Sequence, residues 1–262
     1  MYSIKSFMQL LEDYAPLSIS KRLIEQGDYD NSGVIVKSCD TVNGVLFTLD
    51  LTVQSVKRAK ALGINTIVTH HPAIYTPIKS LECDNPNTCA VLSAIKQGIN
   101  VISMHLNLDM ATHGIDESLA LGLGAKEYKI IDKLDQDIGY GREFNCNLTL
   151  GDIVKNVKKE FGTQKVIAYG KKTQKISKIA SFCGAGASQA VKAIANRLTS
   201  ADLIVTSDVP HHLIKEIIEN GLALVILPHY VAEVYGFKKF YQEITKNSKG
   251  LKTYFLDDVR FR

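Results

Sequence analysis

Apolar and polar residues follow two different periods along the first half of the chain. Phe7, Leu10, Leu11 and Tyr14 recur at helical spacing within residues 6–14, and this pattern stops before Pro16. Short runs rich in β-branched residues at 45–49, 65–69 and 99–103 predict strands, with helices at about 53–63 and 88–97 between them. Strands that alternate with helices predict a mostly parallel sheet covered by helices on both faces.

The same alternation returns in the second half. The segment at about 128–147 contains Gly139, Gly141 and many charges, and we interpret it as a connection between two lobes. After it we expect a helix at 152–161, strands at 176–182 and 203–206, and a helix between these strands. The predicted fold is α/β, with two three-layer lobes at 1–127 and 128–225. Residues 226–262 then form a return segment that packs on the first lobe.

Composition excludes several classes of protein. Of the 262 residues, 45% are hydrophobic and 22% are charged, which is enough apolar material for a sizeable core. No apolar run approaches the ~18 residues that cross a bilayer. The five cysteines are scattered and form no CxxC pair, as is typical of reduced cytosolic thiols. We therefore expect a cytoplasmic protein without a membrane partner.

The charge pattern gives only a weak basic signal. The formal net charge of +4 is spread over the chain, and there is no tryptophan to stack on bases. We interpret the densest lysines as solvated faces of a helix and a loop, and we expect no nucleic-acid partner. These lysines are Lys155, Lys158 and Lys159, followed by Lys171, Lys172, Lys175 and Lys178.

A partial internal repeat places histidines and acids at matching points of the two halves. In each half a β-branched strand precedes a pair of histidines, and the next strand precedes a histidine with an acid four residues later. The two copies are His70, His71, His105 and Asp109, and then His211, His212, His229 and Glu233. All seven histidines of the chain lie in or beside these clusters.

From this clustering we predict a pair of divalent metal ions. Imidazole nitrogens and carboxylate oxygens suit zinc, iron, manganese, cobalt or nickel. The adjacent side chains of His70 and His71 diverge, which suits two ions better than one. Two ions about 3.5–4 Å apart can share one carboxylate, here that of Glu233. The predicted metal ligands are His70, His71, Asp109, His229 and Glu233.

The predicted centre favours hydrolysis. Two divalent ions bring four positive charges, and Asp109 and Glu233 return only two of them. The remainder favours a bridging hydroxide as the nucleophile and an anionic substrate. His105 lies four residues before Asp109 and is the candidate catalytic residue that orients or transfers a proton.

Other polar positions have simpler interpretations. We interpret His113 and His211 as ordinary surface or core residues. The glycine turn at Cys183–Ser188 either holds a phosphate or allows close backbone packing, and the lack of a P-loop lysine favours packing. The role of His212 stays open.

These motifs resemble the NGG-interacting-factor-three family, whose bacterial members are labelled GTP cyclohydrolase 1 type 2 homologues. The resemblance covers nearly the whole chain. It rests on segments 30–34, 49–52, 67–72, 105–109, 183–186, 207–212 and 229–233. The chain departs from the family pattern at Tyr29, Leu106, Ser207 and Pro228, none of which is a proposed ligand.

The resemblance implies a fold, a metal arrangement and an assembly. Two α/β lobes would face each other across the metal site, and the chains would assemble as a toroidal homohexamer built from dimers. His71 and Asp109 would bind one ion, His70 and His229 the other, and Glu233 both.

Two functional hypotheses follow. The first is a metal-dependent hydrolase that acts on a small anionic substrate, a nucleotide or a phosphorylated compound. The family label suggests GTP ring opening, but a shared fold and shared metals leave the substrate unspecified. The second is a non-catalytic metal-handling or interaction protein that uses the ring-shaped assembly.

Overall fold

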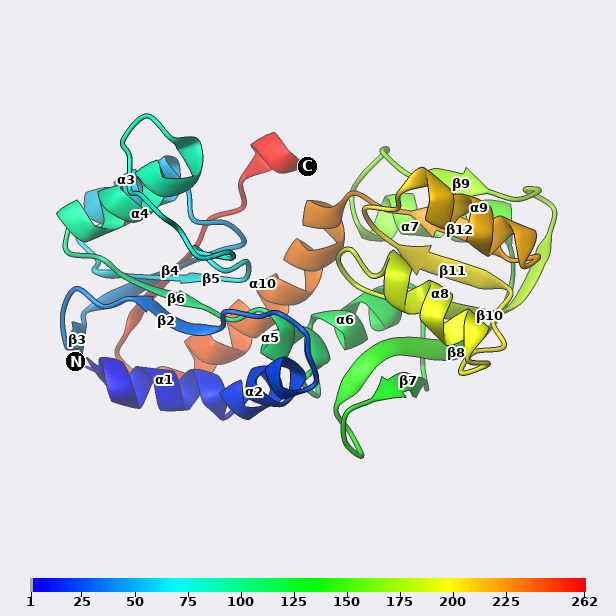
Figure 1. The fold of residues 1–262 in the computed structure, drawn as a ribbon, viewed down its shortest axis with the longest axis horizontal. Helices are drawn as coiled ribbons and strands as arrows, with labels where there is room; N and C mark the ends of the chain where they lie inside the picture. Colours follow the sequence, from blue (N-terminus) through cyan, green and yellow to red (C-terminus); the bar gives the residue numbers. More distant parts are fainter. Residues whose placement is uncertain (1) are drawn as a thin grey trace. The chain divides into compact units, whose positions relative to one another are not determined.

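The computed structural model describes residues 2–262 as two compact units (Figure 1). Unit 1 takes the chain up to Ala111 and then Phe237–Asp258. Unit 2 takes Thr112–Gly236 and Val259–Arg262. The chain therefore divides after residues 111 and 236, whereas the sequence pattern placed the divisions after 127 and 225.

Unit 1 is built on a five-stranded sheet in the order β13-β4-β5-β6-β2. Its pairings are parallel except for the antiparallel edge strand β2. The strands are β2 (Gly33–Val36), β4 (Gly44–Thr48), β5 (Thr66–Thr69), β6 (Asn100–Ser103) and β13 (Lys252–Phe255). A separate two-stranded sheet pairs β1 (Tyr2–Ser3) with β3 (Thr41–Val42).

Helices cover both faces of this sheet (Figure 1). They are α1 (Ile4–Glu12), α2 (Leu17–Glu25), α3 (Val53–Ala61), α4 (Pro86–Lys96), α5 (Leu106–Met110) and the second part of α10 (His229–Asn247). Thr52 caps α3 in a capping box with Ser55.

The core of unit 1 has a different composition on the two faces of the sheet. On one face, Val56 of α3 and Val91 of α4 pack against the β-branched residues of the strands. On the other face, Phe47 of β4 meets Phe237 and Phe240 of α10 with ring centroids 6.2 and 6.1 Å apart. Each of these aromatic side chains is buried, which stabilises the fold by about 1.5–3 kcal/mol per ring.

Unit 2 is built on a six-stranded sheet in the order β7-β8-β10-β11-β12-β9. The central strands β10, β11 and β12 are parallel, and the outer strands run antiparallel to their neighbours. The strands are β7 (Lys129–Lys133), β8 (Gly139–Thr149), β9 (Ile167–Tyr169), β10 (Lys175–Ser181), β11 (Leu203–Thr206) and β12 (Ala223–Ile226).

The interpretation of 128–147 as a connection is wrong, because β7 and most of β8 lie there. β7 is an edge strand, and three of its five residues are exposed. Edge strands often carry charged residues that discourage pairing with other chains. That composition hides the alternation by which a strand is recognised.

The helices of unit 2 are α6 (Ile115–Gly122), α7 (Leu150–Glu160), α8 (Ala187–Ala195), α9 (His211–Glu219) and the start of α10, with a 3₁₀ helix, η1 (Val259–Phe261). Ala190 of α8 and Ile217 of α9 pack on Ile204 and Leu224 of the central strands. The α/β prediction is confirmed for both units. Within residues 2–262, no helix combines the length and the apolar character that a membrane span requires.

Candidate functional site

In unit 1 the predicted ligands follow the carboxyl ends of neighbouring parallel strands. β4, β5 and β6 lie side by side in parallel, with Thr48 beside Thr69 and Thr69 beside Ser103. The chain leaves them toward Asp50, His70 and His105 respectively. Because these ends meet at one edge of the sheet, side chains far apart in sequence lie close together.

Three imidazoles and a carboxylate form the resulting cluster. The ring of His70 lies 5.0 Å from that of His71 and 5.3 Å from that of His105, measured between centroids. Nε2 of His70 lies 3.4 Å from Oδ1 of Asp109. His70 is fully buried and Asp109 is 4% exposed. His70, His105 and Asp109 together offer a group of donor atoms suited to a metal ion.

His105 and Asp109 share one side because α5 begins directly after His105. The amide of Asp109 donates to the carbonyl of His105 over 2.9 Å, which makes the segment a helical turn. Asp109 lies in the first turn of a short helix and faces the imidazoles.

Each imidazole of this cluster is oriented through its Nδ1 atom. Nδ1 of His70 lies 2.8 Å from the carbonyl of Met104, and Nδ1 of His71 lies 2.8 Å from Oδ1 of Asp50. Nδ1 of His105 lies 2.7 Å from Oδ1 of Asp30. Carbonyl and carboxylate oxygens only accept, so the proton is on Nδ1 and Nε2 is the nitrogen that can coordinate an ion.

Asp30 is itself held as an anion. Burial raises the pKa of its carboxyl, but His105 and the hydroxyls of Ser20 and Ser32 outweigh this and leave the pKa below 3.8. Ser32 also accepts from the amide of His105 over 3.1 Å. The turn at 30–33 therefore fixes His105 through both its ring and its backbone.

Unit 2 repeats this arrangement on its own sheet. β10, β11 and β12 are neighbouring parallel strands, and the chain leaves them toward Gly184, Asp208 and His229 respectively. The partial internal repeat therefore reflects the same arrangement of three parallel strands in both units. Asp208, rather than His211 or His212, occupies the position after β11 that corresponds to the histidine pair of unit 1.

His229 and Glu233 form a second set of donor atoms. They begin α10 four residues apart, and Nε2 of His229 lies 2.9 Å from Oε2 of Glu233. Nδ1 of His229 lies 2.5 Å from Oδ2 of Asp208. Asp208 has a backbone φ of +47°, a left-handed conformation that aspartate tolerates better than most residues. Glu233 is 2% exposed.

The glycine turn after β10 packs against Glu233. Gly184 has a φ of +57°, and a Cβ atom there would lie 2.6 Å from Oε1 of Glu233. The prediction of close backbone packing at this turn is confirmed.

A buried ion pair holds this turn in place. Asp116 accepts from the amide of Cys183 over 2.9 Å and from Nη1 of Arg142 over 2.9 Å. Both side chains are almost completely buried. Burial raises the pKa of Asp116 above its ordinary value of 3.8, and the guanidinium of Arg142 offsets this only in part.

The remaining histidines lie elsewhere. His211 and His212 open α9 and are exposed. His113 is exposed too, and its ring nitrogen lies 3.1 Å from Glu117. The sequence did not single out the carboxylates that orient the imidazoles, although they lie in the segments that carry the resemblance. These carboxylates are Asp30, Asp50 and Asp208.

Comparison with known proteins places the chain in a family. Residues 2–259 match the model of Duf34/NIF3 (NGG1p interacting factor 3). The chain belongs to the Duf34/NIF3 family. A Lactococcus lactis relative named GTP cyclohydrolase 1 type 2 homolog is 33% identical over 236 residues, which cover 88% of each chain. A Clostridium perfringens relative of the same name is 29% identical over 235 residues, 88% of this chain and 86% of its own.

Solved structures agree with this assignment. A Staphylococcus aureus protein superposes with a TM-score of 0.85 and 25% identity, over 100% of this chain and 99% of its own. Reduced HcgD from Methanocaldococcus jannaschii superposes with a TM-score of 0.80 and 26% identity, over 98% of each chain. A Bacillus cereus protein related to NIF3 has a TM-score of 0.84 at 18% identity, over 98% and 97%, and supports the fold alone.

The donor atoms of this Duf34/NIF3 chain fit divalent metal ions. In each unit an imidazole nitrogen lies close to a buried carboxylate oxygen, His70 with Asp109 and His229 with Glu233. Two such electron-rich atoms attract a cation. The Nδ1 partners complete the carboxylate–histidine arrangement that is typical of metal ligands. No sulfur is among the donors, as in open catalytic sites.

Proposed function

We propose that the chain is a metal-dependent hydrolase with a dinuclear centre. Its ligands are His70, His71 and Asp109 of unit 1, with His229 and Glu233 of unit 2. The observation that carries the proposal is the anchoring of each imidazole through Nδ1, which orients Nε2 before any ion binds. Zinc, iron, manganese, cobalt and nickel all suit this donor set, and cellular supply selects among them.

Bound ions would acidify a coordinated water and polarise the bond to be hydrolysed. The other roles belong to the side chains. Asp50 and Asp208 keep His71 and His229 in the tautomer that binds through Nε2. His105 holds its proton on Nδ1 against Asp30, so its Nε2 can accept a proton from water or substrate.

The proposed substrate is a small anion, a nucleotide or phosphorylated compound. Counting only Asp109 and Glu233, the two ions retain a positive excess. Asp30, Asp50 and Asp208 add three negative charges around the histidines, which removes that excess. An anionic substrate would therefore be held by direct coordination at open positions rather than by a general positive field. The relatives' name suggests GTP as one substrate to test.

Metal content and turnover together test the proposal. We expect about two ions per chain by elemental analysis of protein purified without added metal, and hydrolysis of at least one compound in a panel of phosphoesters, nucleotides and GTP. Glu233→Gln should lower turnover by at least about 100-fold, because it removes a ligand charge at the centre. His211→Ala is the matched control, since His211 is an exposed histidine outside the ligand set.

The alternative function is non-catalytic metal handling. It would be favoured by two bound ions per chain without turnover on any compound of the panel. A stable protein that binds none of the candidate ions would leave only the family assignment.

Assembly and location form part of the same proposal. We propose a homohexamer, a toroid of dimers, in the cytoplasm, with no membrane or nucleic-acid partner. The family resemblance supports the assembly, and the scattered cysteines support the location. Light scattering coupled to gel filtration should give six times the mass of one chain, and the mass of one chain or of a dimer would contradict it.

A further inference from the structure

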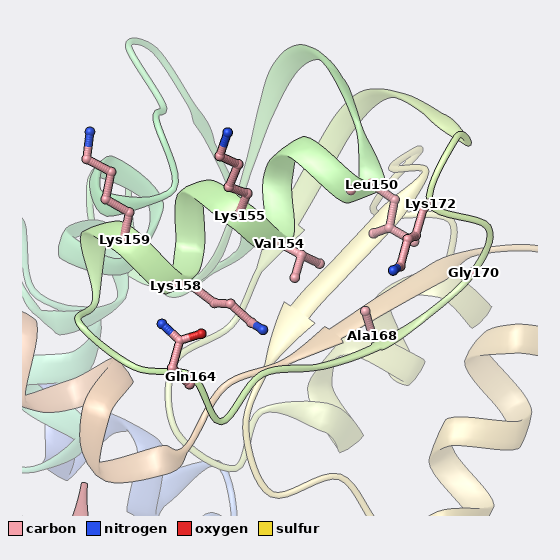
Figure 2. Close-up of a pocket in the computed structure, with 10 residues that line it drawn as sticks. Leu150, Val154, Lys155, Lys158, Lys159, Gln164, Ala168, Gly170 and Lys172 are labelled. Carbon is pink, nitrogen blue, oxygen red and sulfur yellow. The ribbon is translucent and has the colours of Figure 1, made fainter.

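A pocket of unit 2 lies apart from the candidate metal ligands. It has a volume of about 540 Å³ and is formed by α7 and by the segment 164–172, which contains β9 (Figure 2). Leu150, Val154 and Ala168 supply apolar walls. The volume lies within the range of small-molecule sites, which are mostly apolar with a few placed polar groups. None of the five proposed metal ligands lines it.

The lysines around this pocket fall into two pairs. Figure 2 shows the ammonium groups of Lys158 and Lys172 directed toward the hollow from different sides, with the amide of Gln164 beside Lys158. Lys155 and Lys159 of the same helix also line the pocket, but their ammonium groups point away from the hollow. Lys155, Lys159 and Lys172 are exposed, whereas Lys158 is half-buried. By exposure, the solvated-face interpretation holds for Lys155, Lys159 and Lys172, and of these four lysines only Lys158 is partly covered by protein.

We propose that this pocket binds a small phosphorylated molecule with an apolar or aromatic body. Two ammonium groups on different sides of the hollow match the two charges of a phosphate monoester. Among the described residues that line the pocket none is acidic, so this positive charge is not neutralised inside it. The apolar walls receive the body of the ligand, and the Gln164 amide can donate to or accept from a polar edge.

The pocket is independent of the metal centre in both residues and chemistry. The pocket offers lysine ammonium groups and apolar walls, whereas the proposed metal centre uses imidazoles and carboxylates. The proposal therefore stands whether or not the chain is a hydrolase. It assigns unit 2 a binding site for an effector or a second substrate.

Fluorescence anisotropy with a defined probe tests the proposal. The probe is AMP carrying an N-methylanthraniloyl group, titrated with full-length protein in the presence of EDTA. The same fluorophore on adenosine, which lacks the phosphate, is the comparison ligand. We expect saturable binding of the AMP probe, at least about tenfold weaker binding of the adenosine probe, and weaker binding of AMP as salt is raised.

Charge-matched variants locate the probe. The double variant Lys158→Glu and Lys172→Glu should weaken binding at least about 100-fold, because two charged contacts are lost. The double variant Lys171→Glu and Lys175→Glu changes the net charge equally at exposed lysines that do not line the pocket, and it should leave binding within about threefold. Circular dichroism checks that both variants fold.

Each other outcome overturns the proposal in a recognisable way. An equal loss of affinity for the AMP probe in both double variants would mean that the probe is attracted to a basic surface and does not bind in the pocket. Binding that requires added metal instead of EDTA, and that is lost in Glu233→Gln but not in the double variant of Lys158 and Lys172, would place the probe at the metal centre and leave the proposed function intact. Absence of saturable binding would rule out this ligand class.

Discussion

Glu143 is a buried carboxylate that joins several parts of unit 2. It is 4% exposed on β8 and lies 3.0 Å from Nζ of Lys129 on β7 and 3.6 Å from Nζ of Lys178 on β10. It also accepts from the hydroxyl of Thr199 over 2.5 Å and from the amide of Ser200 over 2.8 Å. Burial raises its pKa, but these donors outweigh burial and leave the pKa below 4.5.

This lowered pKa predicts an acid-sensitive contribution to stability. The folded protein holds the anion of Glu143 more strongly than the unfolded chain does, so the contribution is complete above pH 4.5 and is lost as the pH falls below it. Glu143→Gln should reduce the free energy of unfolding by about 1–3 kcal/mol at pH 7. The melting temperatures of variant and wild type should converge as the pH falls toward 3.

Asp132→Asn is the matched control, because Asp132 is an exposed carboxylate on the neighbouring strand β7. Calorimetry from pH 7 to pH 3 should show no such convergence for it. A constant difference between Glu143→Gln and wild type across this range would contradict the assignment.

At the scale of single residues, the sequence predicted the candidate metal ligands but not the carboxylates that orient the histidine ligands. The histidines were found because they cluster after strands and lie four residues from acids. Asp30, Asp50 and Asp208 escaped because hydrogen bonding to a distant Nδ1 leaves no fixed spacing in the sequence. Asp208 lies 21 residues before its histidine, and Asp30 lies 75 before His105.

At the scale of elements, the Cys183–Ser188 turn controls the position of Glu233. Gly184 combines a left-handed φ of +57° with an approach to Oε1 of Glu233 that no larger residue permits. Gly184→Ala should therefore have two effects. The left-handed backbone should cost about 1 kcal/mol of stability, and the added methyl group should displace the carboxylate.

The second effect can be separated from the first. Gly162 has a φ of +63° with open space around it, so Gly162→Ala carries a similar backbone cost without the contact. Competition with a chelator should show at least about tenfold weaker metal binding for Gly184→Ala alone, as a shifted ligand carboxylate implies. Equal metal affinity in the two variants would show that the approach to Glu233 does not matter for binding.

Helices and strands were predictable where a capping residue, a β-branched run or a glycine marked their ends. The capping residue Thr52, the β-branched run ending at Thr69 and the glycine after β10 each marked a boundary that the structure has within a few residues. β7 was missed because it is an edge strand rich in charged residues, and its neighbour β8 was missed because Gly139 and Gly141 interrupt the apolar pattern. Such segments become strands because neighbouring strands pair with them, and a local sequence pattern does not show this pairing.

At the scale of the whole molecule, the divisions between units could not be read from the sequence. The second division falls at 236–237, inside the continuous helix α10. Helical residues continue through this point, so no turn, proline or polar linker marks it. The two units nevertheless carry the same kind of site, a set of donors beyond three parallel strands.

If both units supply ligands to the same ions, metal should change how the chain unfolds. An ion bound by ligands from both units stays bound only while both units are folded. Unfolding of either unit therefore loses the free energy of metal binding. With a chelator, calorimetry should show two transitions. With metal at about 100 times its Kd, a stabilisation of about 2.7 kcal/mol should merge them into one transition at higher temperature. Glu233→Gln, which removes a unit 2 ligand, should leave two transitions in metal, with His211→Ala behaving as wild type. If metal instead raises only one of two transitions in the wild type, the ions belong to a single unit.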